Sequence, residues 1–132
     1  MPAAVDLEPP PDPARQLRFE LEQPRVEKPT AAQVDLLIKT ALATHEPDLE
    51  LPPVRVSGRM RRTLGSYTAS KRRIAISSRL LAMGDDSDVR QVVLHEVAHA
   101  IVHSRFGEKA SAHGSEFRAV CRELDVRPRR YV

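Results

Sequence analysis

Residues 92–102 read Val-Val-Leu-His-Glu-Val-Ala-His-Ala-Ile-Val, and the rest of the chain is best understood from this stretch outward. Two histidines and one glutamate interrupt a segment that is otherwise apolar on every side, which predicts a helix buried at the centre of a domain. The acidic residues 85–88 precede it and suit a helix N-terminus, because carboxylates cap free backbone N–H groups and complement the helix dipole. We therefore expect one long helix that runs to about Arg105 and stops at Gly107.

The polar residues of this helix form the pattern His-Glu-x-x-His. His95 and His99 are four residues apart and lie on one helix face, so that their imidazoles can bind a single Zn²⁺ at about 2.0–2.1 Å. Glu96 projects roughly 100° further round the helix, where it can reach a water on the metal without binding the metal itself. This pattern is typical of metal-assisted hydrolysis with a glutamate as general base. The alternative interpretation is a pair of satisfied core histidines beside a surface glutamate.

A catalytic zinc needs a third protein ligand and one open position. His103 lies eight residues from His95, about 12 Å along the helix axis, so the two cannot share an ion. We expect His103 to be a neighbour of the site or a surface histidine. The chain can turn at Gly107 and return, which makes His113 the favoured third ligand. Glu116 and Glu108 remain the alternatives.

The segments on either side of this helix predict a mixture of helices and short strands. Thr30 and Gln33 have the spacing of a capping box, and the apolar stripe that follows predicts a helix ending at Pro47. Alternating or β-prone stretches predict strands over 54–57, 60–67 and 72–77, with a turn at 68–71 and a close backbone approach at Gly65. A short helical turn is expected over 78–83. A last helix starts near Ser115, with an apolar face of Phe117, Val120, Cys121 and Leu124.

Composition limits the class of protein. The chain has 132 residues, enough for one ordinary domain. It holds no apolar run long enough for a membrane span, and its first residues lack the basic start and apolar core of a secretory signal. One cysteine, Cys121, excludes an internal disulfide framework and a four-cysteine zinc ribbon. We therefore expect a cytoplasmic protein with no membrane partner.

The N-terminal segment differs from the rest. Seven of the 11 prolines lie in residues 1–29, which are polar and show no periodicity. We expect a disordered tail over 1–29 and a folded domain over 30–132. The alternation of Leu17, Phe19 and Leu21 leaves a short docked strand as the alternative for part of the tail.

Charge is distributed unevenly although the net charge is only +3. Residues 51–84 hold eight lysines and arginines and no acidic residue. Positive charge of this kind favours a polyanionic partner such as DNA. The alternative is that these side chains are simply the solvated outer faces of strands. The candidate nucleic-acid contacts are Arg59, Arg61, Arg62, Lys71, Arg72 and Arg73.

Four segments together resemble the SprT-like family of zinc metallopeptidases. They are residues 59–67, residues 73–77 followed by Leu80, the helix motif 95–100 and the closing motif His113-Gly114-Ser115-Glu116-Phe117. The resemblance covers about residues 34–125. Many members carry a C-terminal cysteine-rich zinc ribbon, so this chain resembles a minimal form.

The resemblance implies an α+β, zincin-like fold with helices packed on a small three-stranded antiparallel sheet. It also implies one zinc ion per chain held by His95, His99 and His113, with Glu96 as the catalytic acid and base. We expect a zinc endopeptidase that acts on a protein or peptide, with DNA-associated proteins as one substrate class. An edge strand containing Gly65 would align the substrate, and Tyr67 and His103 are candidates for oxyanion stabilisation.

Two other functions remain open. The first is a DNA-associated module in which zinc is structural and peptidase activity is weak or absent. The second is a zinc hydrolase that acts on nucleic acid.

Overall fold

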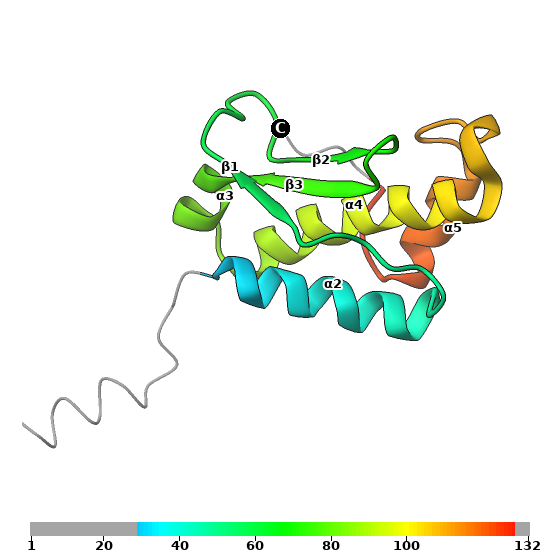
Figure 1. The fold of residues 1–132 in the computed structure, drawn as a ribbon, viewed down its shortest axis with the longest axis horizontal. Coiled ribbons are helices and arrows are strands. Elements are labelled where there is room, and N and C mark those ends of the chain that lie inside the picture. The colour runs from blue at the N-terminus through cyan, green and yellow to red at the C-terminus, as the bar shows by residue number, and fades with distance from the viewer. Residues whose placement is uncertain (1–28, 129–132) are drawn as a thin grey trace, which may run out of the picture.

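The computed structural model describes residues 29–128 and has an α+β fold (Figure 1). Of the expected tail over 1–29, all but Pro29 lies outside the described residues, as do Leu17, Phe19 and Leu21. The boundary between tail and domain therefore stays a prediction. The elements in chain order are α2 (Ala31–His45), β1 (Arg55–Ser57), β2 (Gly65–Thr68), β3 (Arg73–Ser77), α3 (Ser78–Met83), α4 (Asp86–Phe106), a 3₁₀ turn η1 (Gly107–Lys109) and α5 (Ser115–Glu123).

Helix α4 is the buried central helix that the sequence predicts. It begins with a capping box in which the Asp88 backbone N–H donates to Asp85 Oδ1 at 2.8 Å and the Asp85 N–H donates to Asp88 Oδ2 at 3.3 Å. It ends at Gly107, whose φ of 69° lies in the left-handed region that favours glycine. Residues 92–98 are all buried.

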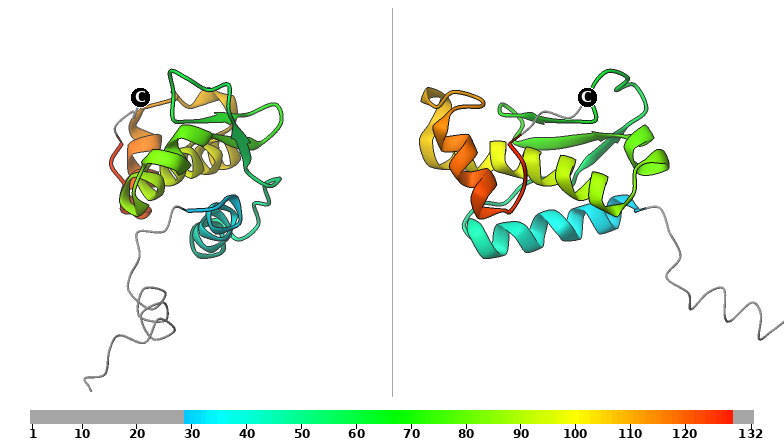
Figure 2. Two further views of the ribbon diagram at one scale, coloured as in Figure 1. Left: turned by 90° about the vertical axis from the view of Figure 1, so that its left-hand side faces the viewer. Right: turned by 180° about the vertical axis from the view of Figure 1, so that it is seen from behind.

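The helix is buried because it lies between two layers. Figure 1 shows the sheet above α4 and α2 beneath it, and the side view in Figure 2 shows the same order. Helix α5 packs against the C-terminal half of α4. The core joins all these elements, with Ile38 of α2, Ile76 of β3 and Phe117 of α5 among its buried members. None of the helices in residues 29–128 has the length and hydrophobicity of a membrane-spanning segment.

The sheet corrects the expectation of purely antiparallel pairing. Its strand order is β1-β3-β2, and β3 pairs antiparallel with β2 but parallel with β1. After β1 the chain crosses the end of β3, forms β2 at the opposite edge and returns as β3 between the two. Strands β1 and β3 therefore run in the same direction. Strand β2 stays at an edge, beside α4.

The strand expected over 60–67 is also shorter than predicted, because only Gly65–Thr68 is a strand. Residues 60 and 61 do not pair with a strand, and their backbone carbonyls instead accept hydrogen bonds from side chains at the start of α3. Ser77 Oγ donates to the Met60 carbonyl at 3.1 Å, and Arg79 Nη1 donates to the Arg61 carbonyl at 3.0 Å. These bonds hold residues 60–61 as a loop.

The flanking helices agree with the sequence. Thr30 and Gln33 form the predicted capping box of α2, whose buried face includes Val34, Ile38 and Leu42. Of the predicted apolar face, Phe117, Val120 and Cys121 lie on α5 and Leu124 is its C-cap residue, and all four are buried. Burial raises the pKa of the Cys121 thiol to about 11, so this cysteine is a core residue and not a reactive thiolate.

Candidate metal centre

His95, Glu96 and His99 all lie on α4, the helix that packs against the sheet. His95 is 4% exposed and Glu96 is 7% exposed, while His99 is half-buried. The alternative of core histidines beside a surface glutamate does not fit, because the glutamate is buried with them. A carboxylate and two imidazoles in a protein interior are costly unless hydrogen bonds or a cation compensate them.

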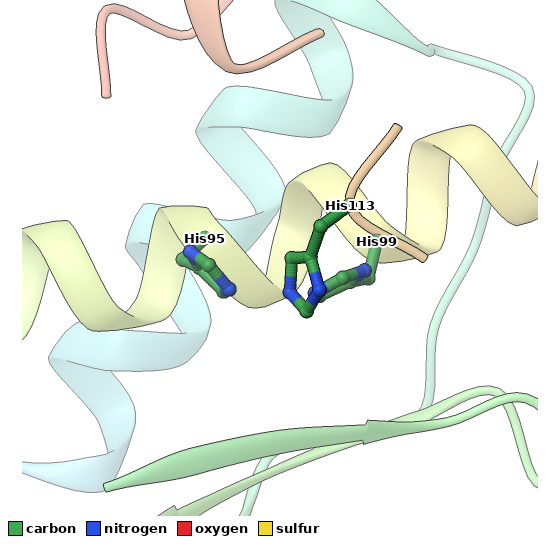
Figure 3. A group of neighbouring side chains, drawn as sticks. All are labelled: His95, His99 and His113. Atoms are coloured by element: carbon green, nitrogen blue, oxygen red, sulfur yellow. The ribbon is translucent and has the colours of Figure 1, made fainter. Parts of the chain in front are cut away.

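A third histidine reaches the same place from another segment. His113 lies between η1 and α5, after the chain has turned back at Gly107. The ring centroid of His113 lies 5.6 Å from that of His95 and 4.8 Å from that of His99. Figure 3 shows the three imidazoles gathered on one side of α4. We call His95, His99 and His113 the histidine cluster.

The histidine cluster has the donor set of a zinc site, and its spacing is somewhat wider than that around a bound ion. One ring nitrogen from each residue lies within 4.8 Å of the other two. Nitrogens that bind one tetrahedral zinc at about 2.05 Å are about 3.3 Å apart, so a closure of roughly 1.5 Å or less would complete the site. His113 is exposed, which leaves the cluster open on one side for water or a substrate. The residues present therefore fit a catalytic rather than a closed structural zinc.

The pKa of His99 also favours the binding of a cation. Burial, with the positive charges that His95 and His113 would carry, lowers the pKa of His99 from 6.5 to about 4. The imidazole of His99 is therefore neutral at physiological pH. A neutral imidazole is the form that binds a metal.

Phe117 forms an aromatic wall behind the cluster, a role that the sequence analysis did not assign. Its ring stacks on His99 with centroids 4.3 Å apart and an angle of 23°, and meets His95 and His113 edge-on at 5.0 Å. Phe117 is fully buried. The available signal was an aromatic residue four positions after the third histidine.

A cleft of about 440 Å³ opens over the cluster. Its wall opposite α4 comes from the edge strand β2, through Gly65, Ser66 and Tyr67. The close approach expected at Gly65 is present: a Cβ on this residue would lie 2.8 Å from Val92 Cγ1 and 3.3 Å from Glu96 Oε2. Absence of a side chain at Gly65 therefore lets β2 pass directly over the glutamate.

The alternative third ligands lie elsewhere. Glu116 accepts a hydrogen bond from Ser115 Oγ at 3.3 Å, and Glu108 is exposed at the rim of the cleft. Within residues 29–128, the only group of metal-binding side chains is the histidine cluster, which includes neither glutamate. His103 is outside the cluster as well, and lines the cleft beside Tyr67.

Apart from Arg73, the candidate nucleic-acid contacts lie in two connections of the sheet. Arg59, Arg61 and Arg62 precede β2 and are exposed, whereas Lys71 and Arg72 are exposed in the turn that follows it. Figure 1 shows these two connections at opposite ends of the sheet. The sixth candidate, Arg73, is half-buried at the start of β3.

Comparison with solved structures supports the assignment of the fold. The α+β fold is zincin-like and resembles the crystal structure of the metallopeptidase zymogen of Methanocaldococcus jannaschii jannalysin. The similarity has a TM-score of 0.53 at 13% identity and covers 68% of this chain and 79% of that one.

The family follows from the sequence. Residues 35–131 match the family model described as SprT-like family, and the chain belongs to this family. Protein SprT of Pseudomonas entomophila is 49% identical over 37 residues, and Protein SprT of Pseudomonas putida strain W619 is 47% identical over 34 residues. These matches cover 28% and 26% of this chain, and 23% and 21% of the relatives. The chain therefore matches less than a quarter of the length of these curated relatives.

Proposed function

We propose that this protein is a zinc-dependent endopeptidase that binds one zinc ion per chain through the histidine cluster. The observation that carries the proposal is three imidazole nitrogens within 4.8 Å of one another, beside a buried glutamate, in an open cleft. Membership of the SprT-like family and a fold shared with a metallopeptidase support it.

In this proposal Glu96 moves the proton. A bound zinc would supply a Lewis acid that lowers the pKa of water and polarises a carbonyl group. The Glu96 carboxylate accepts the proton of the attacking water and later delivers it to the nitrogen that leaves. Glu96 lines the cleft, and β2 passes close to its carboxylate at Gly65.

The edge strand β2 would align the substrate. Strand order β1-β3-β2 leaves one side of β2 without a strand partner among residues 29–128, and this strand forms the wall of the cleft. An extended peptide can add to such an edge through main-chain hydrogen bonds. The arrangement suits an unfolded or extended protein segment better than a compact one.

Replacing Glu96 by glutamine tests the proposal. We expect Glu96→Gln to keep its zinc and to lose cleavage of an unstructured protein such as casein by about 10²–10⁴-fold, since general acid–base catalysis is removed. Glu50→Gln makes the same change at an exposed position and should cleave like the wild type. Unchanged cleavage by Glu96→Gln would remove this residue from the mechanism.

A second candidate is a DNA-associated module in which zinc is structural. The exposed arginines and lysine at both ends of β2 favour it, because phosphate contacts come from such side chains. Binding to duplex DNA that weakens steeply with salt, together with no cleavage of protein with or without DNA, would support this candidate over the peptidase. The same incubation with RNA, with and without chelator, tests a nucleic-acid hydrolase.

A further inference from the structure

Tyr67 and His103 meet in the wall of the cleft. Tyr67 comes from β2 and His103 from α4, and the Tyr67 hydroxyl lies 3.2 Å from His103 Nδ1. Their ring centroids are 6.0 Å apart. Both side chains are half-buried and line the same cleft as Glu96 and the histidine cluster.

The proposed mechanism leaves this pair without a role. Within residues 29–128, the group of side chains that could bind a metal is the histidine cluster, and it includes neither His103 nor Tyr67. In peptide hydrolysis, a hydrogen-bond donor that faces the carbonyl oxygen as it gains negative charge would stabilise that charge further. Two polar side chains in the cleft wall can supply that donor.

The hydrogen bond between them can form in two ways, because the roles of the two imidazole nitrogens depend on the tautomer of His103. Burial raises the pKa of Tyr67, and the nearby charge of Arg72 opposes this shift only in part, so the phenol keeps its proton at neutral pH. A protonated hydroxyl can donate to His103 Nδ1, and this is the direction that the proposal takes. A neutral imidazole that accepts at Nδ1 carries its hydrogen on Nε2. His103 Nε2 makes no hydrogen bond with the described part of the chain.

We propose that His103 Nε2–H donates a hydrogen bond to the carbonyl oxygen of the scissile peptide, and that Tyr67 fixes the tautomer that makes this possible. His103 is then a catalytic residue and Tyr67 a positioning residue. The proposal rests on the peptidase function proposed above.

The step balances without further reactants. Water oxygen bonds to the carbonyl carbon and gives its proton to Glu96, while the π electrons of the carbonyl move to its oxygen. His103 stabilises that oxygen by a hydrogen bond and keeps its own proton. The electrons then return, the C–N bond breaks, and the leaving nitrogen takes the proton that Glu96 holds.

Cleavage kinetics give the first test. We expect His103→Ala to lower kcat by about 10²–10³-fold, as for loss of one oxyanion donor, with zinc content unchanged. His103→Gln, which still places an N–H near the Nε2 position, should recover part of this loss. Tyr67→Phe should lower kcat less than His103→Ala does. The control His45→Ala, at the far end of α2, should cleave like the wild type.

Nitrogen NMR gives a second readout that does not depend on activity. In ¹⁵N-labelled protein, the His103 ring should show hydrogen on Nε2, and Tyr67→Phe should shift it toward a mixture of tautomers. A wild-type ring with its hydrogen on Nδ1 would overturn the assigned direction.

The outcomes separate the two proposals. If wild-type protein cleaves and Glu96→Gln does not, but His103→Ala and His103→Gln both keep the wild-type kcat, the oxyanion proposal is overturned and the peptidase stands. If the zinc-loaded wild type cleaves no protein, both are overturned.

Discussion

His99 contacts both other members of the histidine cluster and the aromatic wall formed by Phe117. It lies one helical turn from His95, its ring centroid is 4.8 Å from that of His113, and the Phe117 ring stacks on it at 4.3 Å. Three rings therefore pack around His99.

The lowered pKa of His99 predicts how the metal-free protein responds to acid. Its pKa is about 4 in the folded protein against 6.5 ordinarily, so the unfolded chain binds more protons between these values. The free energy of unfolding should therefore fall as the pH falls from about 6.5 to about 4. Urea unfolding of chelator-treated protein at several pH values measures this.

The matched variant for this prediction is His99→Gln, which cannot titrate. Its stability should depend on pH less steeply over the same range. Equal slopes for the wild type and His99→Gln would show that His99 is not responsible.

At the scale of elements, strand β2 forms the cleft because Gly65 lets it lie against α4. A Cβ at this position would approach Val92 Cγ1 to 2.8 Å, and Val92 is a buried core residue that cannot easily give way. In Gly65→Ala we expect β2 to move away from Glu96 and cleavage to fall by about 10²-fold, since displacements near 1 Å can cost that much. Zinc content should stay at the wild-type level.

Gly58→Ala is the control for this change. A Cβ at Gly58 would meet only Ser78 Oγ, at an ordinary 3.8 Å, and Gly58 does not line the cleft. This variant should keep its activity. Similar activity in both variants would contradict the role given to Gly65.

The elements also show how far the sequence predicts this molecule. Caps and apolar periodicity located α2, α4 and α5, since these signals are local. The partner of β1 could not be predicted, because alternation identifies a strand but not the direction of its neighbour. Residues 60–64 looked like a strand, yet hydrogen bonds from Ser77 and Arg79, distant in sequence, hold residues 60–61 as a loop.

The same distinction applies to the site. The spacing of His95 and His99 follows from helix geometry, so it could be read directly. The positions of His113 and Phe117 depend on how α5 packs against α4. Pairing of Tyr67 with His103 depends on the sheet lying over that helix, and no local pattern records such a contact.

At the scale of the whole molecule, Arg105 ties three helices together. From α4 it donates to Glu46 Oε1 at the end of α2 and to Glu123 Oε2 on α5, both at 2.9 Å, and to the His45 carbonyl at 3.0 Å. The hydrogen bond to Glu123 raises the pKa of Arg105, and the same bond lowers that of Glu123. This network joins the C-terminal ends of α2, α4 and α5.

We expect Arg105→Ala to lower the free energy of unfolding by about 1 kcal/mol, because the ion pairs are partly exposed and screened by solvent. Added salt should reduce the difference from the wild type. Arg90→Ala, an exposed change on the same helix, is the control. Equal stability of Arg105→Ala and the wild type at low salt would show that the network contributes nothing.

Native mass spectrometry of metal content is the most direct test of the metal centre. The wild type should retain one zinc ion per chain, and His113→Ala should lose it or bind it far more weakly, because two ligands from one helix remain. The control Arg90→Ala should keep its zinc. Full zinc occupancy in His113→Ala would show that the ion is held elsewhere and would contradict the three-histidine site.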